Sequence, residues 1–207
     1  MIAEESHVTQ LAVHHKAENA ANLFRKPLCS ELKGLSPGQA RICELFYDHM
    51  PPVGLGVKRS IEECQRMFKG RRWNCSSAYV TENYGPLLTI GKDFYDPLRS
   101  DCGCAGTRET AFTHAILSAG VSHEISRTCR LGLLSSCGCN QEKRPSNLHR
   151  SWVWGGCGDN INYGYQFTLN FIDICEREYD YPKHSKEYAR SLMNRWNNEV
   201  GRKVHKF

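Results

Sequence analysis

Cysteines are the residues whose number and spacing point most clearly to chemistry in this chain. Eleven occur among 207 residues, and the closest pairs have CxC spacing. Structural zinc sites usually draw on CxxC pairs, and proteins of reducing compartments seldom carry so many structural cysteines. We therefore expect disulfides formed in an oxidising compartment, with an odd cysteine that is free or paired outside this chain. The cysteines are Cys29, Cys43, Cys64, Cys75, Cys102, Cys104, Cys129, Cys137, Cys139, Cys157 and Cys175.

Motifs for catalysis or metal binding are absent from the rest of the sequence. It contains no GxSxG nucleophile elbow, no Walker loop and no HExxH helix. His114 and Cys129 fall on one predicted helix, and a rise of about 1.5 Å per residue holds them too far apart to act as a pair. Three other histidines are better explained as the solvated edge of a helix than as metal ligands: His7, His14 and His15. We therefore predict no catalytic residue, no metal site and no cofactor.

The charge balance excludes some classes of partner. A net charge of +5 is too mild to indicate a nucleic-acid-binding protein. The densest basic cluster, Lys69, Arg71 and Arg72 beside Trp73, is typical of a solvated helix end, and its functional alternative is a contact with an acidic cell-surface polysaccharide. No apolar run approaches the ~18 residues that a membrane helix needs. Residues 1–10 do not resemble a signal peptide, so a secreted protein would correspond to a mature form.

The spacing of apolar residues predicts one mainly α-helical domain over residues 1–207. Ser36 and Gln39 can form a capping box at a helix start, and Pro51-Pro52 is expected to end that helix. The expected helices are 3–24, 36–49, about 57–68, 107 or 108 to about 131, 159 or 160 onward, and about 184 onward.

Side-chain periodicity also predicts what the last helix buries and where helix is interrupted. Tyr188, Leu192, Trp196 and Val200 recur at every fourth residue, so we expect them to form a buried stripe. Residues 76–107 and 137–157 lack helical periodicity. The first stretch is expected to be a long loop that is either functional or braced by disulfides. In the second, Trp152 to Trp154 alternate like one arm of a short β-hairpin.

Several ordered segments between Cys29 and Arg202 resemble motifs of the Wnt family of secreted signalling proteins. They are RRWNCS at 71–76, RETAF with HAI at 108–116, CGC at 137–139, WVWGGC at 152–157 and MNRWNNEVGR at 193–202. Two residues depart from the family pattern, because Trp196 stands where the family usually has His and Val200 where it has Ala. Both changes are expected to be repacked within the core.

The resemblance implies an extracellular glycoprotein that acts as a ligand of Frizzled-family receptors in developmental signalling. It implies a disulfide-braced helical bundle with a small β-hairpin. The family's cysteine-rich carboxy-terminal domain and lipid-bearing hairpin, which make most Frizzled contacts, are expected to lie beyond Phe207, so no lipidation site is assigned here. A monomer is expected, with a co-receptor and an acidic polysaccharide as further candidate partners. The loop at 76–107 is the candidate for a surface specific to this member.

The resemblance also assigns pairs to most of the cysteines. It implies the bridges Cys64–Cys75, Cys129–Cys137 and Cys139–Cys157, and we expect Cys29–Cys43 as a fourth. Cys102, Cys104 and Cys175 depart from the usual family set, and we expect Cys175 to pair with Cys102 or Cys104.

The sequence also contains one site for N-linked glycosylation. Asn74-Cys75-Ser76 is the only N-x-S/T sequon, and its place in the family motif implies a glycan on Asn74.

Two alternative functions stay open. A saposin-like lipid-binding module is one alternative, and it would require a large apolar pocket between the helices. A disulfide-rich secreted hydrolase is the other, and it would require a buried acidic or histidine pair with convergent geometry.

Overall fold

The computed structural model describes residues 29, 32, 35–75, 107–140, 146–147, 149–152, 156–178 and 180–204. Three features expected from the sequence therefore fall outside the described residues. They are the helix at 3–24, with His7, His14 and His15; the stretch 76–106, with Cys102 and Cys104; and Val153 to Gly155 of the expected hairpin.

The described part of the chain is mainly α-helical, as the sequence predicted. Its elements are α2 (Pro37–Leu45), the short 3-10 helix η2 (Tyr47–His49), α3 (Met50–Met67), α4 (Arg108–Arg130), α5 (Ile161–Arg177) and α6 (Lys186–Val204). The expected β-hairpin is represented there by one isolated antiparallel bridge between Asn140 and Gly158. No described helix is both long and apolar enough to cross a membrane.

Helix starts follow the polar residues that the sequence offers as caps. Ser36 accepts a hydrogen bond from the backbone N–H of Gln39, whose side chain accepts from the Ser36 N–H, so the predicted capping box is present. Thr107 and Asn160 cap α4 and α5, and each side chain accepts a hydrogen bond at 3.1 Å from the backbone N–H three residues further on.

The expectation that Pro51 and Pro52 end a helix is wrong, because they lie in the first turn of α3. The first turn of a helix has backbone N–H groups without helical partners, so a residue that lacks an N–H costs nothing there.

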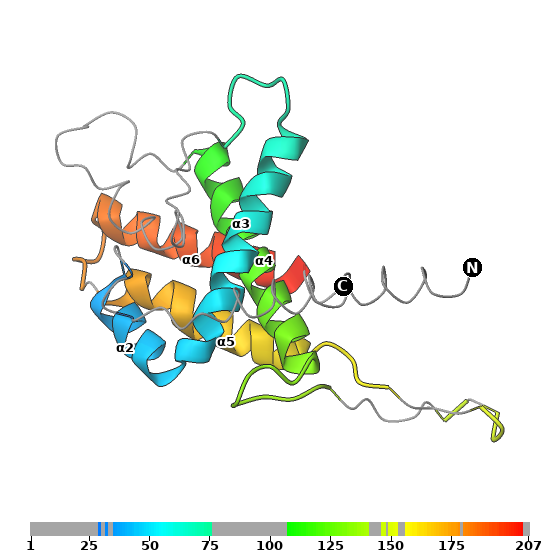
Figure 1. Ribbon diagram of the computed structural model, residues 1–207. Coiled ribbons are helices and arrows are strands. Elements are labelled where there is room, and N and C mark those ends of the chain that lie inside the picture. Colours follow the sequence, from blue (N-terminus) through cyan, green and yellow to red (C-terminus); the bar gives the residue numbers. More distant parts are fainter. Residues whose placement is uncertain are drawn as a thin grey trace, which may run out of the picture.

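Helix α4 lies at the centre of the bundle and packs against α3, α5 and α6 (Figure 1). Small residues allow the close approach on each side. A Cβ on Gly56 would lie 2.7 Å from the Gly120 carbonyl oxygen, and a Cβ on Gly201 would overlap the Ala115 carbonyl. The small residues of α4 around Ala115 and Gly120 therefore allow α3 and α6 to approach its backbone closely.

The hydrophobic core lies along the contacts that α4 makes with α3 and α5. The members from these three helices are Met50, Val53, Val57, Ile61, Leu117, Val121, Ile125, Cys129, Phe167, Phe171 and Ile172. In α3 and α5 the buried residues Val57, Ile61, Phe167 and Phe171 follow a four-residue spacing, so these two helices follow the apolar periodicity of the sequence.

Helix α6 does not follow this rule, and the expectation of a buried apolar stripe there is wrong. Its buried residues are Ser191, Asn194, Asn198, Gly201 and Arg202. Its exposed large apolar residues are Leu192, Met193, Trp196, Val200 and Val204. Trp196 and Val200 are therefore surface residues, and their departure from the family pattern is not repacking of the core.

Candidate functional site: a groove held by the Cys129–Cys137 loop

Four disulfides brace the described structure. They join Cys29 to Cys43, Cys64 to Cys75, Cys129 to Cys137 and Cys139 to Cys157, with Cα–Cα distances of 5.9, 6.2, 5.4 and 5.2 Å. These are the pairs expected from the sequence and the resemblance. Two of them brace the segment between α4 and α5, which carries the groove described below.

Cys175 on α5 is a free thiol in the structure and donates a hydrogen bond to the Ile172 carbonyl at 2.9 Å. Burial, followed by the nearby carboxylates, raises the pKa of this thiol to about 12. It therefore stays protonated and weakly nucleophilic at neutral pH. Because Cys102 and Cys104 lie outside the described residues, a bridge from Cys175 to either of them stays a prediction.

The segment after α3 presents a basic tip and the sequon. Lys69, Arg71 and Arg72 are exposed, while Asn74 is half-buried next to the buried Cys75. Trp73 lies edge-on to Phe68, with ring centroids 5.1 Å apart. The Cys64–Cys75 bridge thus fixes the basic residues and Asn74 at one end of α3.

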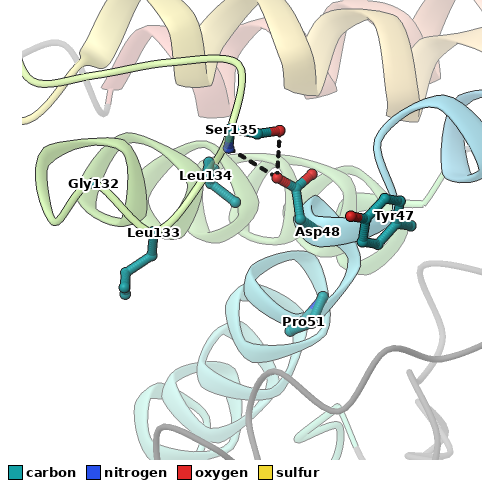
Figure 2. Close-up of a pocket in the computed structure, with 7 residues that line it drawn as sticks. All are labelled: Tyr47, Asp48, Pro51, Gly132, Leu133, Leu134 and Ser135. Carbon is teal, nitrogen blue, oxygen red and sulfur yellow. Dashed lines mark hydrogen bonds between the residues drawn. The ribbon is translucent and has the colours of Figure 1, made fainter.

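A groove of about 440 Å³ lies where η2 and the start of α3 meet the loop that follows α4. Figure 2 shows its lining residues, which are Tyr47, Asp48, Pro51, Gly132, Leu133, Leu134 and Ser135. Gly132 has a φ of +67°, a conformation that glycine adopts without strain, and its N–H donates to the Cys129 carbonyl. The Cys129–Cys137 bridge then closes this loop, so the groove has a covalently restrained wall.

Asp48 fastens the loop to η2. One carboxylate oxygen accepts hydrogen bonds from the backbone N–H and the hydroxyl of Ser135, both at 2.9 Å (Figure 2). The other oxygen accepts from Nδ1 of His49 at 2.7 Å. Burial raises the pKa of Asp48, but the hydrogen bonds from Ser135 and His49 outweigh it, so the pKa lies below its usual value. Asp48 therefore holds the loop as a charged carboxylate.

His49 extends this clasp toward α5. Its ring is fully buried, and Nε2 accepts a hydrogen bond from the Tyr163 hydroxyl at 2.8 Å. Burial lowers the pKa of His49, although the neighbouring Asp48 opposes the shift, so the ring is neutral at physiological pH. Its Nδ1 then carries the proton donated to Asp48. The residues Asp48, His49, Ser135, Ser136 and Tyr163 are called the clasp below.

The clasp contains Asp, His and Ser, but its geometry is not that of a hydrolytic triad. Ser136 Oγ lies 3.3 Å from His49 Nε2, which already has the closer bond from Tyr163. The adjacent Ser135 N–H donates to Asp48, so it is not available to stabilise an oxyanion. In the part of the chain that the structure describes, no three His, Cys, Asp or Glu residues are placed to hold a metal ion. The arrangement therefore fixes a surface loop and does not assemble a reaction centre.

Sequence reasoning missed the groove. Asp48 and His49 are adjacent in the chain and showed no motif, and their partners lie 87 and 114 residues away. The single usable signal was local, because a glycine after a predicted helix and two following serines indicated a tight loop between Cys129 and Cys137.

A second set of buried polar residues fixes α6 on the bundle. The Arg202 guanidinium donates to both carboxylate oxygens of Asp173 on α5. Asn198 donates to the same carboxylate at 3.0 Å, and His114 of α4 is 3.2 Å from the Asn198 side-chain oxygen. His114 is thus a buried residue with a structural role, and it is not part of a catalytic cysteine–histidine pair.

The comparisons with known proteins agree on one family. The model of the Wnt family matches residues 31–206. The chain is 55% identical over 181 residues to Protein Wnt-2 of Caenorhabditis elegans, covering 87% of this chain and 46% of that protein. It is 49% identical over 179 residues to human Protein Wnt-5b, covering 86% and 46%. The chain therefore spans about half the length of these curated relatives.

A solved structure is similar as well. A chain of the structure described as human WLS in complex with WNT8A is 37% identical, with a TM-score of 0.46, over 74% of this chain and 43% of that chain.

Proposed function

Because the chain belongs to the Wnt family, we propose that it is a secreted ligand of Frizzled-type receptors in developmental cell–cell signalling. The family match over residues 31–206 is the observation that carries this proposal. This domain would be the helical scaffold that holds receptor-contacting segments in position. We assign no catalytic residue, metal or cofactor to a ligand of this family. We also propose that the ligand is a monomer and that it has no nucleic-acid partner.

The saposin-like alternative is not favoured. It needs a large apolar chamber between helices, whereas the groove described above is a surface hollow with a charged carboxylate in its wall. A saposin-like module would not account for the sequence motifs that identify the Wnt family.

We propose the groove as a contact for a co-receptor or other protein partner of the ligand. Tyr47 and Leu133 are 44% and 47% exposed there, and the charged Asp48 lies between them. A partner segment that combines an apolar and a basic side chain fits this lining. Leu133→Ser should weaken such a contact, whereas Leu131→Ser is the control, because Leu131 is 55% exposed but does not line the groove.

Asn74 is proposed to carry an N-linked glycan. The sequon lies beside the exposed Arg71 and Arg72, at the end of the bundle formed by the tip of α3. Peptide-level mass spectrometry of the secreted, non-reduced protein tests this together with the bridges. A glycan on Asn74 is expected, and an unmodified Asn74 in all peptides would contradict the proposal.

The basic tip is proposed as a contact for an acidic extracellular polysaccharide. Lys69, Arg71 and Arg72 are all exposed, and a cluster of this kind attracts sulfate and carboxylate groups. Arg71→Ser with Arg72→Ser should elute from a heparin column at lower salt than the parent protein. The matched control is Arg41→Ser with Arg127→Ser, which removes the same charge from exposed positions elsewhere. Equal shifts in the eluting salt concentration for the two double variants would show that net charge alone controls binding to heparin, and would contradict the proposal.

The receptor proposal is tested by signalling. The secreted full-length protein is applied to cells that express a Frizzled-type receptor and to matched cells that lack it, and a pathway reporter is measured. A response that needs the receptor is expected. An equal response in both cell lines, or none in either with a correctly bridged protein, would overturn it.

A further inference from the structure

Helix α6 turns its apolar face away from the protein. Leu192, Met193, Trp196, Val200 and Val204 are 44, 46, 67, 41 and 66% exposed. In a helix of 3.6 residues per turn these positions lie on one side, opposite the buried positions around Asn198 and Arg202. A surface helix normally places its apolar side inward, so this orientation needs an explanation.

The orientation of α6 is fixed by contacts that cannot be kept if the helix rotates. Arg202 and Asp173 form a two-bond ion pair in which both side chains are almost fully buried. Gly201 lies against the backbone of Ala115, where a larger residue would not fit. Rotation would break the ion pair and move a bulky side chain to the Gly201 position. The apolar face is therefore held at the surface by the fold.

Lysines lie at both ends of this face. Lys186 in the first turn and Lys183 just before it are exposed, and Lys203 in the last turn is 59% exposed. The nearby anions are Glu187, which is exposed beside Lys186, and Glu199, which accepts hydrogen bonds from Tyr165 and Arg202 and pairs with Lys203 at 3.3 Å. The apolar strip is thus bordered at both ends by lysines.

We propose that the exposed face of α6 docks on an anionic lipid surface. A helix that presents Trp, Leu, Met and Val together with flanking lysines has the chemistry of an interfacial helix. Its apolar side enters the boundary between headgroups and acyl chains, and its lysines meet anionic headgroups. The tryptophan in the middle of the strip has the amphipathic ring that interfaces favour.

The shape of the strip favours a membrane over a second copy of the chain. A single helix face with five partly exposed side chains offers an area on the order of a few hundred Å², below the ~800 Å² per partner of a standard protein interface. Trp196 and Val200 are also the two positions where this chain departs from the family pattern toward larger apolar residues. The departures at these two positions enlarge the exposed apolar strip, and the proposal does not depend on the receptor proposal.

Vesicle flotation of the intact, disulfide-bonded protein tests the proposal. The probes are vesicles of phosphatidylcholine that contain phosphatidylserine, and vesicles of phosphatidylcholine alone. Trp196→Gln and Leu192→Gln should each reduce partition into the anionic vesicles, Trp196→Gln by about tenfold, because burial of one large apolar side chain is lost. Trp152→Gln is the matched control, since Trp152 is 62% exposed but lies outside α6. Partition that is unchanged in Trp196→Gln, or reduced equally in Trp152→Gln, would overturn the proposal.

Two further measurements test whether the lysines contribute to binding and whether the strip instead binds a second copy of the chain. Lys186→Gln with Lys203→Gln should reduce partition into anionic vesicles and leave partition into neutral vesicles unchanged, and an equal loss on both would contradict the charge argument. Sedimentation of the parent protein without lipid should show no self-association. Association that Trp196→Gln abolishes would assign the strip to a second copy and overturn the lipid proposal. Circular dichroism confirms that the variants are folded.

Discussion

The guanidinium of Arg202 on α6 lies against the carboxylate of Asp173 on α5, with Nη1–Oδ1 and Nη2–Oδ2 distances of 3.0 and 2.9 Å. Both side chains are at most 2% exposed. Asp173 also accepts from Asn198, and Arg202 donates to Ser118 at 3.2 Å. These two buried charges are tolerated because they are paired with each other and hydrogen-bonded. The pair therefore determines which face of α6 points inward.

Removal of one partner of this pair should be strongly destabilising. Arg202→Met leaves the Asp173 carboxylate buried without its cation, and we expect a loss of about 3–5 kcal/mol in the free energy of unfolding. Chemical denaturation followed by circular dichroism measures it. The control is Arg66→Met, because the Arg66–Glu63 pair is exposed and should contribute little to the free energy of unfolding. Equal effects of the two substitutions would contradict the assigned role of Arg202.

Close helix packing predicts a specific sensitivity to a single methyl group. Gly201→Ala places a Cβ against the Ala115 carbonyl, and we expect a loss of about 1–3 kcal/mol as α6 is pushed from α4. Gly138→Ala is the matched control, since no atom lies within 4 Å of its added Cβ. Thermal unfolding of both proteins compares them. A melting temperature of Gly201→Ala that matches the parent would show that the helices are not in this contact.

Stability should depend on pH through His114. Burial is the main reason that the pKa of His114 falls from 6.5 to about 4, although Asn198 and Asp173 oppose the shift. The unfolded state then binds more protons between these values, so the contribution of His114 is complete above pH 6.5 and is lost as the pH falls toward 4. The loss amounts to about 3 kcal/mol.

Denaturation at a series of pH values checks this dependence. His114→Gln should flatten the fall in stability between pH 6.5 and 4, whereas His123→Gln should keep it, because the His123 side chain is 45% exposed. The same pH dependence in the parent and in His114→Gln would show that other groups cause it.

The Cys129–Cys137 bridge should stabilise both the bundle and the groove. Cys129→Ala with Cys137→Ala opens a loop with a sequence separation of 8, and we expect a loss of about 2–3 kcal/mol. Ser135→Ala keeps the bridge and removes one side-chain bond to Asp48, so it should cost about 1 kcal/mol. Urea unfolding distinguishes these. Hydrogen exchange of the Ser135 amide should accelerate in the double variant, and an unchanged rate would contradict the role of the bridge in holding the clasp.

The sequence predicted the features that depend on local chemistry. The capping box at Ser36 forms as expected, and α4 and α5 begin at the positions expected for them, with Thr107 and Asn160 as caps. A capping side chain needs only a backbone N–H two or three residues away, so the local sequence is enough to indicate it. The cores of α3 and α5 likewise followed apolar periodicity.

Features that depend on distant partners could not be predicted in the same way. The clasp joins His49 to Tyr163 across 114 residues, and nothing in either local sequence indicates the other. The orientation of α6 follows from Arg202 and Asp173, whose pairing overrides the apolar periodicity of Leu192, Trp196 and Val200. The position of Pro51 was misjudged because one proline pattern suits both the end of a helix and the first turn of the next.

The central claim is that this chain supplies the scaffold of a Frizzled ligand, and direct binding tests it most simply. The secreted, disulfide-bonded full-length protein is titrated against an immobilised Frizzled extracellular domain, with the destabilised Arg202→Met variant in parallel. We predict saturable binding by the parent protein and a loss of binding in the variant above the temperature at which it unfolds. No saturable binding by a parent protein that mass spectrometry shows to be correctly bridged would contradict the claim.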